Sequence, residues 1–338
     1  MKTHLLTFAA ILLAGSPAEA SETRTVDRTL PVTAEVELDV VSNPGGVTVT
    51  AGSSAVVRIR ATIKPLLKAV DLGLADANIQ ALAQNPPIEQ TGNRIRIGYV
   101  SDPAFLRGVT IHFEIETPQA TRVHAHTSSG RIQIDGIDGP ALADSSSGGI
   151  EISNVTTGVV VKTSSGAVVI RKPGGPLSAR TTSGGIQVVD AGATVDVETG
   201  SGRTELSQIR GGVRARTQSG SIRIDNVDGA VVATNHSGSI DVLQVSGSVQ
   251  AETGSGAIQI SQLRPAAITA RARSGALKVE LAKGQGYTLD AQSNSGKVSG
   301  PATTGADDIA RPHQLKGQVG VGGPLVDLDT HSSRITIQ

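Results

Sequence analysis

Residues 163–188, TSSGAVVIRKPGGPLSARTTSGGIQV, hold one full repeat of this chain and the beginning of the next. A Ser-Gly pair marks the start of each repeat and returns every 18 residues. The glycines of the regularly spaced pairs are Gly130, Gly148, Gly166, Gly184, Gly202, Gly220, Gly238 and Gly256. Because a unit this short cannot bury an apolar face of its own, successive units have to stack around one core. The period therefore predicts a solenoid.

Two stretches of each repeat alternate apolar and polar residues, which is typical of half-buried strands. The first pairs of apolar residues are Ile132 and Ile134, Ile150 and Ile152, Val168 and Ile170, Ile186 and Val188, Ile222 and Ile224, Ile240 and Val242, and Ile258 and Ile260. The second pairs are Ala141 and Ala143, Val159 and Val161, Leu177 and Ala179, Val195 and Val197, Val213 and Ala215, Val231 and Ala233, and Val249 and Ala251. We therefore expect an all-β fold, a parallel β-solenoid with two short strands per 18-residue rung and about ten rungs.

An 18-residue period also equals three hexapeptides, the repeat of a three-sided left-handed coil. That coil needs an apolar residue at every sixth position, but the corresponding sites hold Lys162, Arg180, Glu198 and Arg216. A flattened coil with two sides fits the sequence better. A short third side near the Thr-x-Ser triplets and the handedness of the coil stay open.

The serine of each Ser-Gly pair has a structural interpretation. Glycine permits the positive φ of a tight corner, and serine can hydrogen bond to the local backbone there. In a stack, the serine hydroxyls would form a ladder with a spacing of about 4.8 Å. We therefore expect corner serines such as Ser147, Ser165 and Ser183 to be hydrogen bonded and not catalytic.

Residues 1–20 have the pattern of a signal peptide. A basic start and an apolar run precede the small residues Ala18 and Ala20 of a cleavage site. No later apolar run approaches the roughly 20 residues of a membrane-spanning helix, so we expect no integral membrane segment in the mature chain. The protein should be exported, and be periplasmic, at the cell surface or secreted.

The rest of the chain divides at the point where the period begins. Residues 21–126 lack it and are expected to form a β-rich capping segment with one helix near residues 66–83. Residues 127–338 are expected to form the solenoid repeats. A polar surface loop near residues 301–318 should interrupt them, at a place where repeat proteins carry insertions or an end cap.

The composition excludes several classes of site and partner. The chain has no cysteine, so disulfides and thiolate metal sites are absent. Its 30 Lys and Arg balance its 30 Asp and Glu. Balanced charge argues against nucleic acid or an anionic membrane as a partner, because both are held by an excess of Lys and Arg.

Two groups of charged surface residues are candidates for a catalytic site. Glu205, Arg223 and Asp241 occupy the same position of three consecutive rungs, an arrangement that suits a polysaccharide lyase with calcium-binding acids and a basic residue. Alternating charges on the other strand favour a plain charge ladder instead. Asp225, Asp228 and Asp241 could supply the paired acids of a glycoside hydrolase, but Asp is ordinary beside turn residues.

Histidines suggest one further site. His112, His124 and His126, together with Glu114, could form a zinc or nickel set where the solenoid begins. Solvated surface histidines are the simpler interpretation. The sequence thus supports no assigned catalytic residue, metal site or cofactor, and the binding residues are unknown.

Two stretches resemble a known family. Residues 110–118 (TIHFEIETP) followed by residues 127–136 (TSSGRIQIDG) look like the entry into a bacterial β-strand-repeat family of unknown function that carries the name "putative adhesin". Residues 322–325 (GGPL) and 333–337 (SRITI) resemble the family's usual end, with Arg334 where glycine is expected. The resemblance runs from about residue 34 to the end. It implies a solenoid at the cell envelope and no catalytic residues.

We therefore expect an exported, non-enzymatic β-solenoid that is adhesin-like or serves as an envelope scaffold or interaction protein. Its partner would be an envelope or surface macromolecule, either protein or glycan. Two alternatives stay open: a polysaccharide-active β-helix enzyme, either lyase or hydrolase, and a sensory module of an envelope-stress system.

Overall fold

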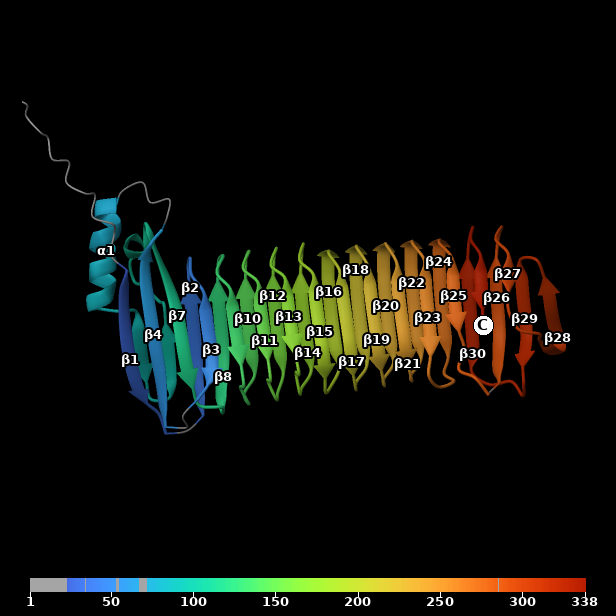
Figure 1. The fold of residues 1–338 in the computed structure, drawn as a ribbon, viewed down its shortest axis with the longest axis horizontal. Helices are drawn as coiled ribbons and strands as arrows, with labels where there is room; N and C mark the ends of the chain where they lie inside the picture. Colours follow the sequence, from blue (N-terminus) through green and yellow to red (C-terminus); the bar gives the residue numbers. More distant parts are fainter. Residues whose placement is uncertain (1–22, 34, 53–54, 67–71, 285) are drawn as a thin grey trace, which may run out of the picture.

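The computed structural model describes residues 23–33, 35–52, 55–66, 72–284 and 286–338. Over these residues two long sheets run side by side along one axis, with strands stacked rung upon rung (Figure 1). One connected apolar core fills the space between the sheets from end to end. The predicted all-β parallel solenoid is confirmed. The expected signal peptide, residues 1–20, lies outside the described residues.

The sheets contain 15 and 16 strands among the described residues, and we call them sheet A and sheet B. Sheet A, in spatial order, is β1 (Arg24–Pro31), β4 (Val56–Pro65), β7 (Val109–Thr117), β3 (Val47–Ala51), β9 (Ile132–Asp135), β11 (Ile150–Ser153), β13 (Val168–Arg171), β15 (Ile186–Ala191), β17 (Thr204–Ile209), β19 (Ile222–Val227), β21 (Ile240–Val245), β23 (Ile258–Gln262), β25 (Leu277–Glu280), β31 (Ile335–Ile337) and β27 (Val298–Ser299). Sheet B is β5 (Ile88–Thr91), β6 (Arg94–Ile97), β2 (Val36–Ser42), β8 (Thr121–Thr127), β10 (Ala141–Ser145), β12 (Val159–Thr163), β14 (Leu177–Thr181), β16 (Val195–Ser201), β18 (Val213–Ser219), β20 (Val231–Ser237), β22 (Val249–Ser255), β24 (Ile268–Ser274), β30 (Leu325–Thr330), β26 (Tyr287–Ser293), β29 (Gln314–Val319) and β28 (Thr304–Arg311).

Each rung contributes one strand to each sheet, as the two apolar pairs predict. Neighbouring rungs pair in parallel and in register, for example Ile150 with Val168. The Ile-rich strands form sheet A and the Val/Ala-rich strands form sheet B. Ile150, Ile186 and Ile222 are at most 2% exposed, so the predicted aliphatic columns face the core.

At or just after the end of six successive strands of sheet A, from β11 to β21, the chain bends through a backbone feature that the sequence pattern conceals. One non-glycine residue per rung has a positive φ of 52° to 59°, and these residues are Asn154, Lys172, Asp190, Gln208, Asn226 and Gln244. The left-handed conformation turns the next side chain inward, and Val155, Ile209 and Val227 are completely or almost completely buried. Burial of that side chain offsets the strain of the corner, which costs roughly 1–2 kcal/mol per residue.

The Ser-Gly corner is held by a different hydroxyl from the one expected. Thr181, three residues before Gly184, points inward and accepts a hydrogen bond from the Gly184 N–H at 3.0 Å. The same buried position holds Ser42, Thr127, Ser145, Thr163, Thr181, Thr199, Thr217, Asn235, Thr253, Thr330 and Ser293 in successive rungs, with Ala272 as an exception.

The expectation of a serine ladder at the Ser-Gly pairs is therefore wrong. Ser147, Ser165 and Ser183 are exposed, and within the described residues their hydroxyls have no hydrogen-bond partner. The physical reason is that the chain turns outward after the inward-pointing threonine, so the side chain of the serine that follows points toward solvent. The ladder that stabilises the stack is the buried one.

Glycine at this corner is needed mainly because rungs stack so closely there. A Cβ built on Gly148 would overlap the carbonyl oxygen of Gly130, and one on Gly166 would overlap that of Gly148. A positive φ, from 136° to 144°, occurs only at Gly220, Gly238 and Gly256 of the regularly spaced corner glycines. The contact between rungs therefore dictates this residue more generally than the backbone angle does.

Both ends of the stack contain an exchanged rung. Near the N-terminus, β2 and β3 lie between the rung of β6 and β7 and the rung of β8 and β9. Near the C-terminus, β30 and β31 lie between the rung of β24 and β25 and the rung of β26 and β27. At each end, the outermost rung in chain order is thus covered by a rung from a more internal part of the chain. Antiparallel strands close sheet A at the N-terminal end and sheet B at the C-terminal end.

The segments outside the period have definite structures. The described part of residues 21–126 shares both sheets with residues 127–338, because β3 pairs with β9 in sheet A and β8 pairs with β2 and with β10 in sheet B. The helix expected near residues 66–83 is α1 (Leu72–Gln84), which packs on β4 and β1, while residues 67–71 lie outside the described part. A short 3₁₀ helix, η1 (Pro103–Leu106), lies beside it.

The stretch expected to be a polar loop near residues 301–318 instead contains β28 and most of β29, which pair antiparallel at the end of sheet B. Leu315 of β29 is 8% exposed and joins the core, so a largely polar segment still gains enough apolar contact to order. Of the helices in the described residues, none combines the length and apolarity needed to cross a bilayer.

Replacing Thr181 by Val should lower the free energy of unfolding by about 1–2 kcal/mol, because the Gly184 N–H loses its acceptor at nearly constant side-chain volume. Urea unfolding followed by circular dichroism measures this. The matched control is Ser183→Ala, at the exposed serine two residues later, which should change stability by less than about 0.5 kcal/mol. Equal effects of the two variants would contradict the role given to the buried hydroxyl.

Replacing Gly166 by Ala should cost about 1–3 kcal/mol of unfolding free energy, because the new methyl group would be forced against the backbone of the neighbouring rung. Gly149→Ala is the control, since a Cβ there would meet the Ala167 oxygen at an ordinary 3.5 Å. The same urea titration compares them, and a stable Gly166→Ala variant would show that the rungs can move apart at the corner.

Candidate binding groove on sheet B

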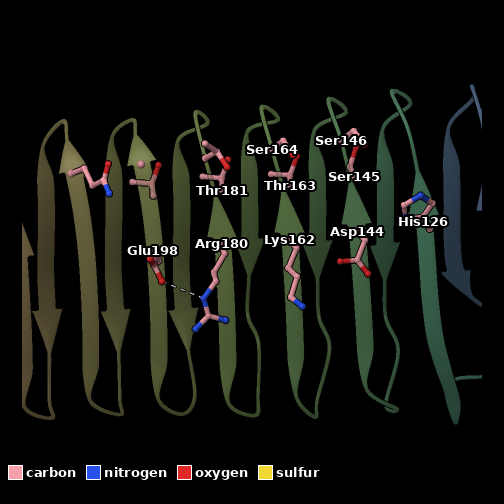
Figure 2. A pocket seen from close by; sticks show the side chains of 14 residues that line it. His126, Asp144, Ser145, Ser146, Lys162, Thr163, Ser164, Arg180, Thr181 and Glu198 are labelled. Atoms are coloured by element: carbon pink, nitrogen blue, oxygen red, sulfur yellow. Dashed lines mark hydrogen bonds and ion pairs between the residues drawn. The ribbon is translucent and has the colours of Figure 1, made fainter.

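The outward side chains of sheet B form a charged row along the solenoid axis. Because the strands are in register, the same outward position of each rung lies beside that of the next. The charged row consists of His126, Asp144, Lys162, Arg180, Glu198, Arg216, Thr234, Glu252, Arg271 and Asp329. Figure 2 shows its first half, with the side chains standing on successive strands.

A second row of polar residues lies at the corner above the charged row. This corner row begins with Ser146, Ser164, Thr182, Gly200 and Gln218. Between the two rows, a hollow of about 460 Å³ extends from His126 to Gln218, and one of about 420 Å³ is lined by residues from Thr234 to His331. We call the two hollows together the groove. Its walls repeat once per rung.

Most charges of the charged row are already neutralised by a neighbouring rung. Arg180 contacts Glu198 at 3.3 Å and Asp196 at 4.0 Å. Further along, Arg271 contacts Asp327 at 3.0 Å and Glu252 at 3.8 Å. These pairs are solvent exposed, so each contributes little stability, at most about 1 kcal/mol. Their main effect is to fix where the side chains point.

On sheet A, the structure aligns Glu205, Arg223 and Asp241 on the adjacent strands β17, β19 and β21, as the sequence spacing predicts. The three side chains face outward. Glu205 forms its ion pair with Arg203 at 3.3 Å. Arg223 has no ion-pair partner within the described residues, and none of the hollows described above includes it. The alignment is present, but no enclosed site surrounds it.

The candidate hydrolase acids do not converge. Asp225 lies two residues after Arg223 on β19 and is in register with Leu243, not with Asp241. Asp228 lies in the turn that follows β19, where its N–H donates to the Ile209 carbonyl at 3.0 Å. The three aspartates therefore occupy separate positions on the surface.

The proposed histidine set is divided between the two sheets. His112 and Glu114 lie on β7 of sheet A, whereas His124 and His126 lie on β8 of sheet B. The described residues contain no group of three or more histidine and acidic side chains placed to hold a metal ion. The sequence could not show which sheet each of these strands belongs to, and the structure places the two pairs of residues on different sheets.

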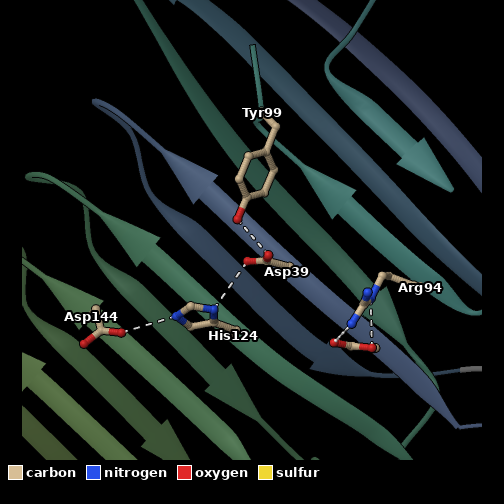
Figure 3. A network of polar contacts seen from close by, with 6 residues as sticks. Asp39, Arg94, Tyr99, His124 and Asp144 are labelled. Atoms are coloured by element: carbon tan, nitrogen blue, oxygen red, sulfur yellow. Dashed lines mark hydrogen bonds and ion pairs between the residues drawn. The ribbon is translucent and has the colours of Figure 1, made fainter. Parts of the chain in front are cut away.

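His124 belongs to a polar network across four strands of sheet B (Figure 3). Tyr99 donates to Asp39 at 2.7 Å, and the His124 ring lies 3.5 Å from Asp39 and 3.3 Å from Asp144. Burial and the hydrogen bond to Asp39 raise the pKa of Tyr99. Arg96 stacks over the Tyr99 ring, 3.9 Å from its centre. The network links the exchanged strand β2 to the strands on both of its sides.

A second ion pair reinforces the same strand. Two nitrogens of Arg94 on β6 contact the Glu37 carboxylate of β2 at 2.6 and 2.9 Å. That hydrogen bonding lowers the pKa of Glu37. These contacts show what the titratable residues at this end do, since they connect the side chains of the exchanged strand β2 to both of its neighbours.

A hollow of about 460 Å³ also lies on sheet A near this end. Two of its three arginines are matched within it, because Arg58 contacts Glu116 at 2.7 Å and Arg60 contacts Asp27 at 2.8 Å, while Arg28 donates to the Asp27 carbonyl at 3.2 Å. The groove on sheet B is longer, repeats along the axis and keeps cationic groups available. It is the better candidate for a binding surface.

The sequence could have identified this groove. Aligning the repeats at a period of 18 places the charged row and the corner row in two fixed columns. The charged column by itself indicates only that the coil is not built of hexapeptides and that charges alternate along it. The corner column was missed, because Ser, Thr, Gly and Gln there look like ordinary turn residues.

The stability of the protein should fall below about pH 6.5 in a manner that depends on His112. Desolvation, and then the charge of Lys64, lower the pKa of His112, while Glu114 opposes them. Its Nδ1 accepts a hydrogen bond from the Gly46 N–H at 3.0 Å, which requires an unprotonated Nδ1. The unfolded chain therefore takes up this proton first as the pH falls, and unfolding becomes easier.

Urea midpoints between pH 7.5 and 5 test this. The His112→Gln variant should lose less stability on acidification than the natural protein, whereas His236→Gln, at an exposed corner, should match the natural protein. An unchanged pH slope in His112→Gln would disprove the role of this histidine.

Comparison with solved structures finds two crystal structures of low sequence identity. A crystal structure of a "putative adhesin" from Bacteroides fragilis NCTC 9343 is 13% identical, with a TM-score of 0.33, covering 94% of this chain and 99% of the other. A crystal structure of a "putative cell adhesion protein" from Clostridium sporogenes ATCC 15579 is 11% identical, with a TM-score of 0.16, covering 93% and 99%. No curated protein matches the chain.

The model of the Toastrack DUF4097 family matches residues 47–207 and again residues 176–338. The overlap of the two matches lies within the regular repeats, where one rung can substitute for another. Because the matched residues run from 47 to 338 and so include most of the chain, the protein belongs to the Toastrack DUF4097 family.

Proposed function

We propose that this protein is an exported, non-enzymatic β-solenoid that acts at the cell envelope as an adhesin-like or scaffold protein. In this proposal the groove of sheet B holds an extended partner macromolecule. Export is supported by the signal-peptide pattern of residues 1–20. The absence of cysteine fits a fold stabilised by ladders and packing alone.

The observation that carries the proposal is the repetition of the groove. Its polar groups recur at the spacing of the rungs, about 4.8 Å, along most of the solenoid. A small molecule would touch one or two rungs of such a surface. A linear polymer could contact each rung in turn and gain affinity from many weak interactions.

One observation favours a different function. Glu205, Arg223 and Asp241 stand side by side on three strands, as a basic residue between two acids. Such a set could abstract a proton from a uronic acid with the help of calcium. This enzyme alternative places its chemistry on sheet A, so experiments that separate the two sheets also separate the two functions.

The proposal predicts saturable binding of the purified protein to isolated bacterial cell envelopes, measured by cosedimentation. Ser164→Tyr places a bulky ring in the groove and should weaken this binding at least about tenfold. The matched control, Gln187→Tyr, adds the same ring to the outer face of sheet A and should leave binding unchanged.

Absence of saturable binding, or equal loss in both variants, would refute the proposal. So would enzymatic activity on sheet A. Incubation with uronic-acid polymers and calcium should give no unsaturated product, and product formation that Arg223→Ala abolishes would replace the binding function by that of a lyase.

A further inference from the structure

Among the Asp, Glu, Lys and Arg residues of the charged row, the sign of the charge alternates from one to the next except at one place. Asp144, Lys162, Arg180 and Glu198 follow one another in register, so Lys162 and Arg180 are like-charged neighbours. They are the one like-charged neighbouring pair in this row, all of which lies in the described part of the chain. Like charges directly opposite each other on adjacent strands are destabilising. An anion between them would relieve that repulsion.

Neither flanking acid neutralises Lys162. The Asp144 carboxylate lies 3.3 Å from the His124 ring, and the Glu198 carboxylate lies 3.3 Å from Arg180. Within the described residues, Lys162 has no ion-pair or hydrogen-bond partner, and its side chain is exposed in the groove (Figure 2). Its ammonium group is therefore free to bind an anionic group of a ligand.

Hydroxyl groups border this cation on one side. Ser146 and Ser164 belong to the corner row beside Asp144 and Lys162, and both are exposed. Their hydroxyls have no hydrogen-bond partner in the described part of the structure. A hydroxyl both donates and accepts, so these groups can bind either the hydroxyls or the ring oxygens of a sugar.

A small apolar area borders the cation on the other side. Leu142 and Val160 occupy neighbouring outward positions of β10 and β12 and are 37% and 36% exposed. They lie two residues before Asp144 and Lys162 on the same strands, on the same face of sheet B. Cation, hydroxyls and aliphatic surface together match the carboxylate, hydroxyls and C–H face of an acidic sugar.

The rung spacing distinguishes between two kinds of polymer. A peptide extended along the axis advances by about 3.3 Å per residue, against about 4.8 Å per rung, so its successive residues cannot each face one rung and only about every third residue returns to an equivalent place. A pyranose chain advances per sugar by about the distance of one rung. Its substituents can therefore meet equivalent groups on successive rungs.

We propose that the groove binds a carboxylate-bearing polysaccharide, with Lys162 and Arg180 as its primary anion site. The proposal rests on the proposed function and specifies the chemical class of the partner. Carboxylates of the polymer contact Lys162 and Arg180, sugar hydroxyls contact Ser146 and Ser164, and a ring face packs on Leu142 and Val160.

Two cellulose derivatives test this directly, because they share a backbone and differ in charge. The full-length protein should bind carboxymethylcellulose and fail to bind hydroxyethylcellulose at the same concentration, by affinity electrophoresis or calorimetry. Lys162→Gln should weaken binding to carboxymethylcellulose at least about tenfold, as expected for loss of a charge-assisted hydrogen bond. Arg223→Gln, which removes an exposed cation from sheet A, should not change it.

A second variant is expected to bind the polymer more tightly, a result that a misfolded protein would not give. Glu198→Gln removes the nearer acid that Arg180 contacts and leaves Arg180 with its longer contact to Asp196 and its hydrogen bond to the Ser178 hydroxyl. The affinity for carboxymethylcellulose should rise about threefold or more. An unchanged or weaker affinity would contradict the assignment of Arg180 to the anion site.

The outcomes separate this inference from the proposed function. Equal binding of both cellulose derivatives would overturn the role of the carboxylate, and equally tight binding of poly-L-glutamate would overturn the choice of a polysaccharide. Binding to cell envelopes that persists without any binding to carboxymethylcellulose would refute the inference and leave the proposed function standing. Failure to bind envelopes as well would refute both.

Discussion

The close stacking of backbone on backbone at the Ser-Gly corner is the constraint on which the rest of this structure depends. There the carbonyl of one glycine occupies the space that a Cβ of the next rung's glycine would need. The corner therefore fixes the register of each rung against its neighbour. Register in turn places aliphatic residues in columns inside the sheets and polar residues in rows outside them.

Regular repetition explains why so much of the fold was predictable from the sequence. A column of Ile at a period of 18 has few explanations other than stacked strands, and Ile150 and Ile186 lie in the core as expected. Local features that depend on direction were not predictable. Thr181 and Ser183 differ little in chemistry, yet one is buried and the other exposed, because the turn between them reverses the side that each faces.

The candidate site, like the fold, was predictable from the sequence only in part. Aligning the repeats in the sequence shows the charged row as a column. The feature that suggests a binding site is the break in its alternation of charge, the adjacent cations Lys162 and Arg180. Which acids compensate them depends on the network around His124 and on Asp196, which only coordinates reveal. The histidines looked like a metal set in the sequence because strand order could not be deduced where the period is absent. In the structure, His124 holds a rung in place.

The exchanged rungs give the molecule an unusual response to tension. In a simple linear stack the chain end is also the outermost rung, so a pull on the end peels repeats away one at a time. Here β2 and β30 each have a neighbour on both sides, and each neighbour lies deeper in the chain. A force on the C-terminus would first have to extract β31 and then β30, each of which is paired on both sides, so two ladders would break together. A force on the N-terminus would first meet the edge strand β1, which pairs only with β4. The C-terminal rung is therefore harder to extract than the terminal rung of a simple stack, and the two ends of the molecule differ in this respect.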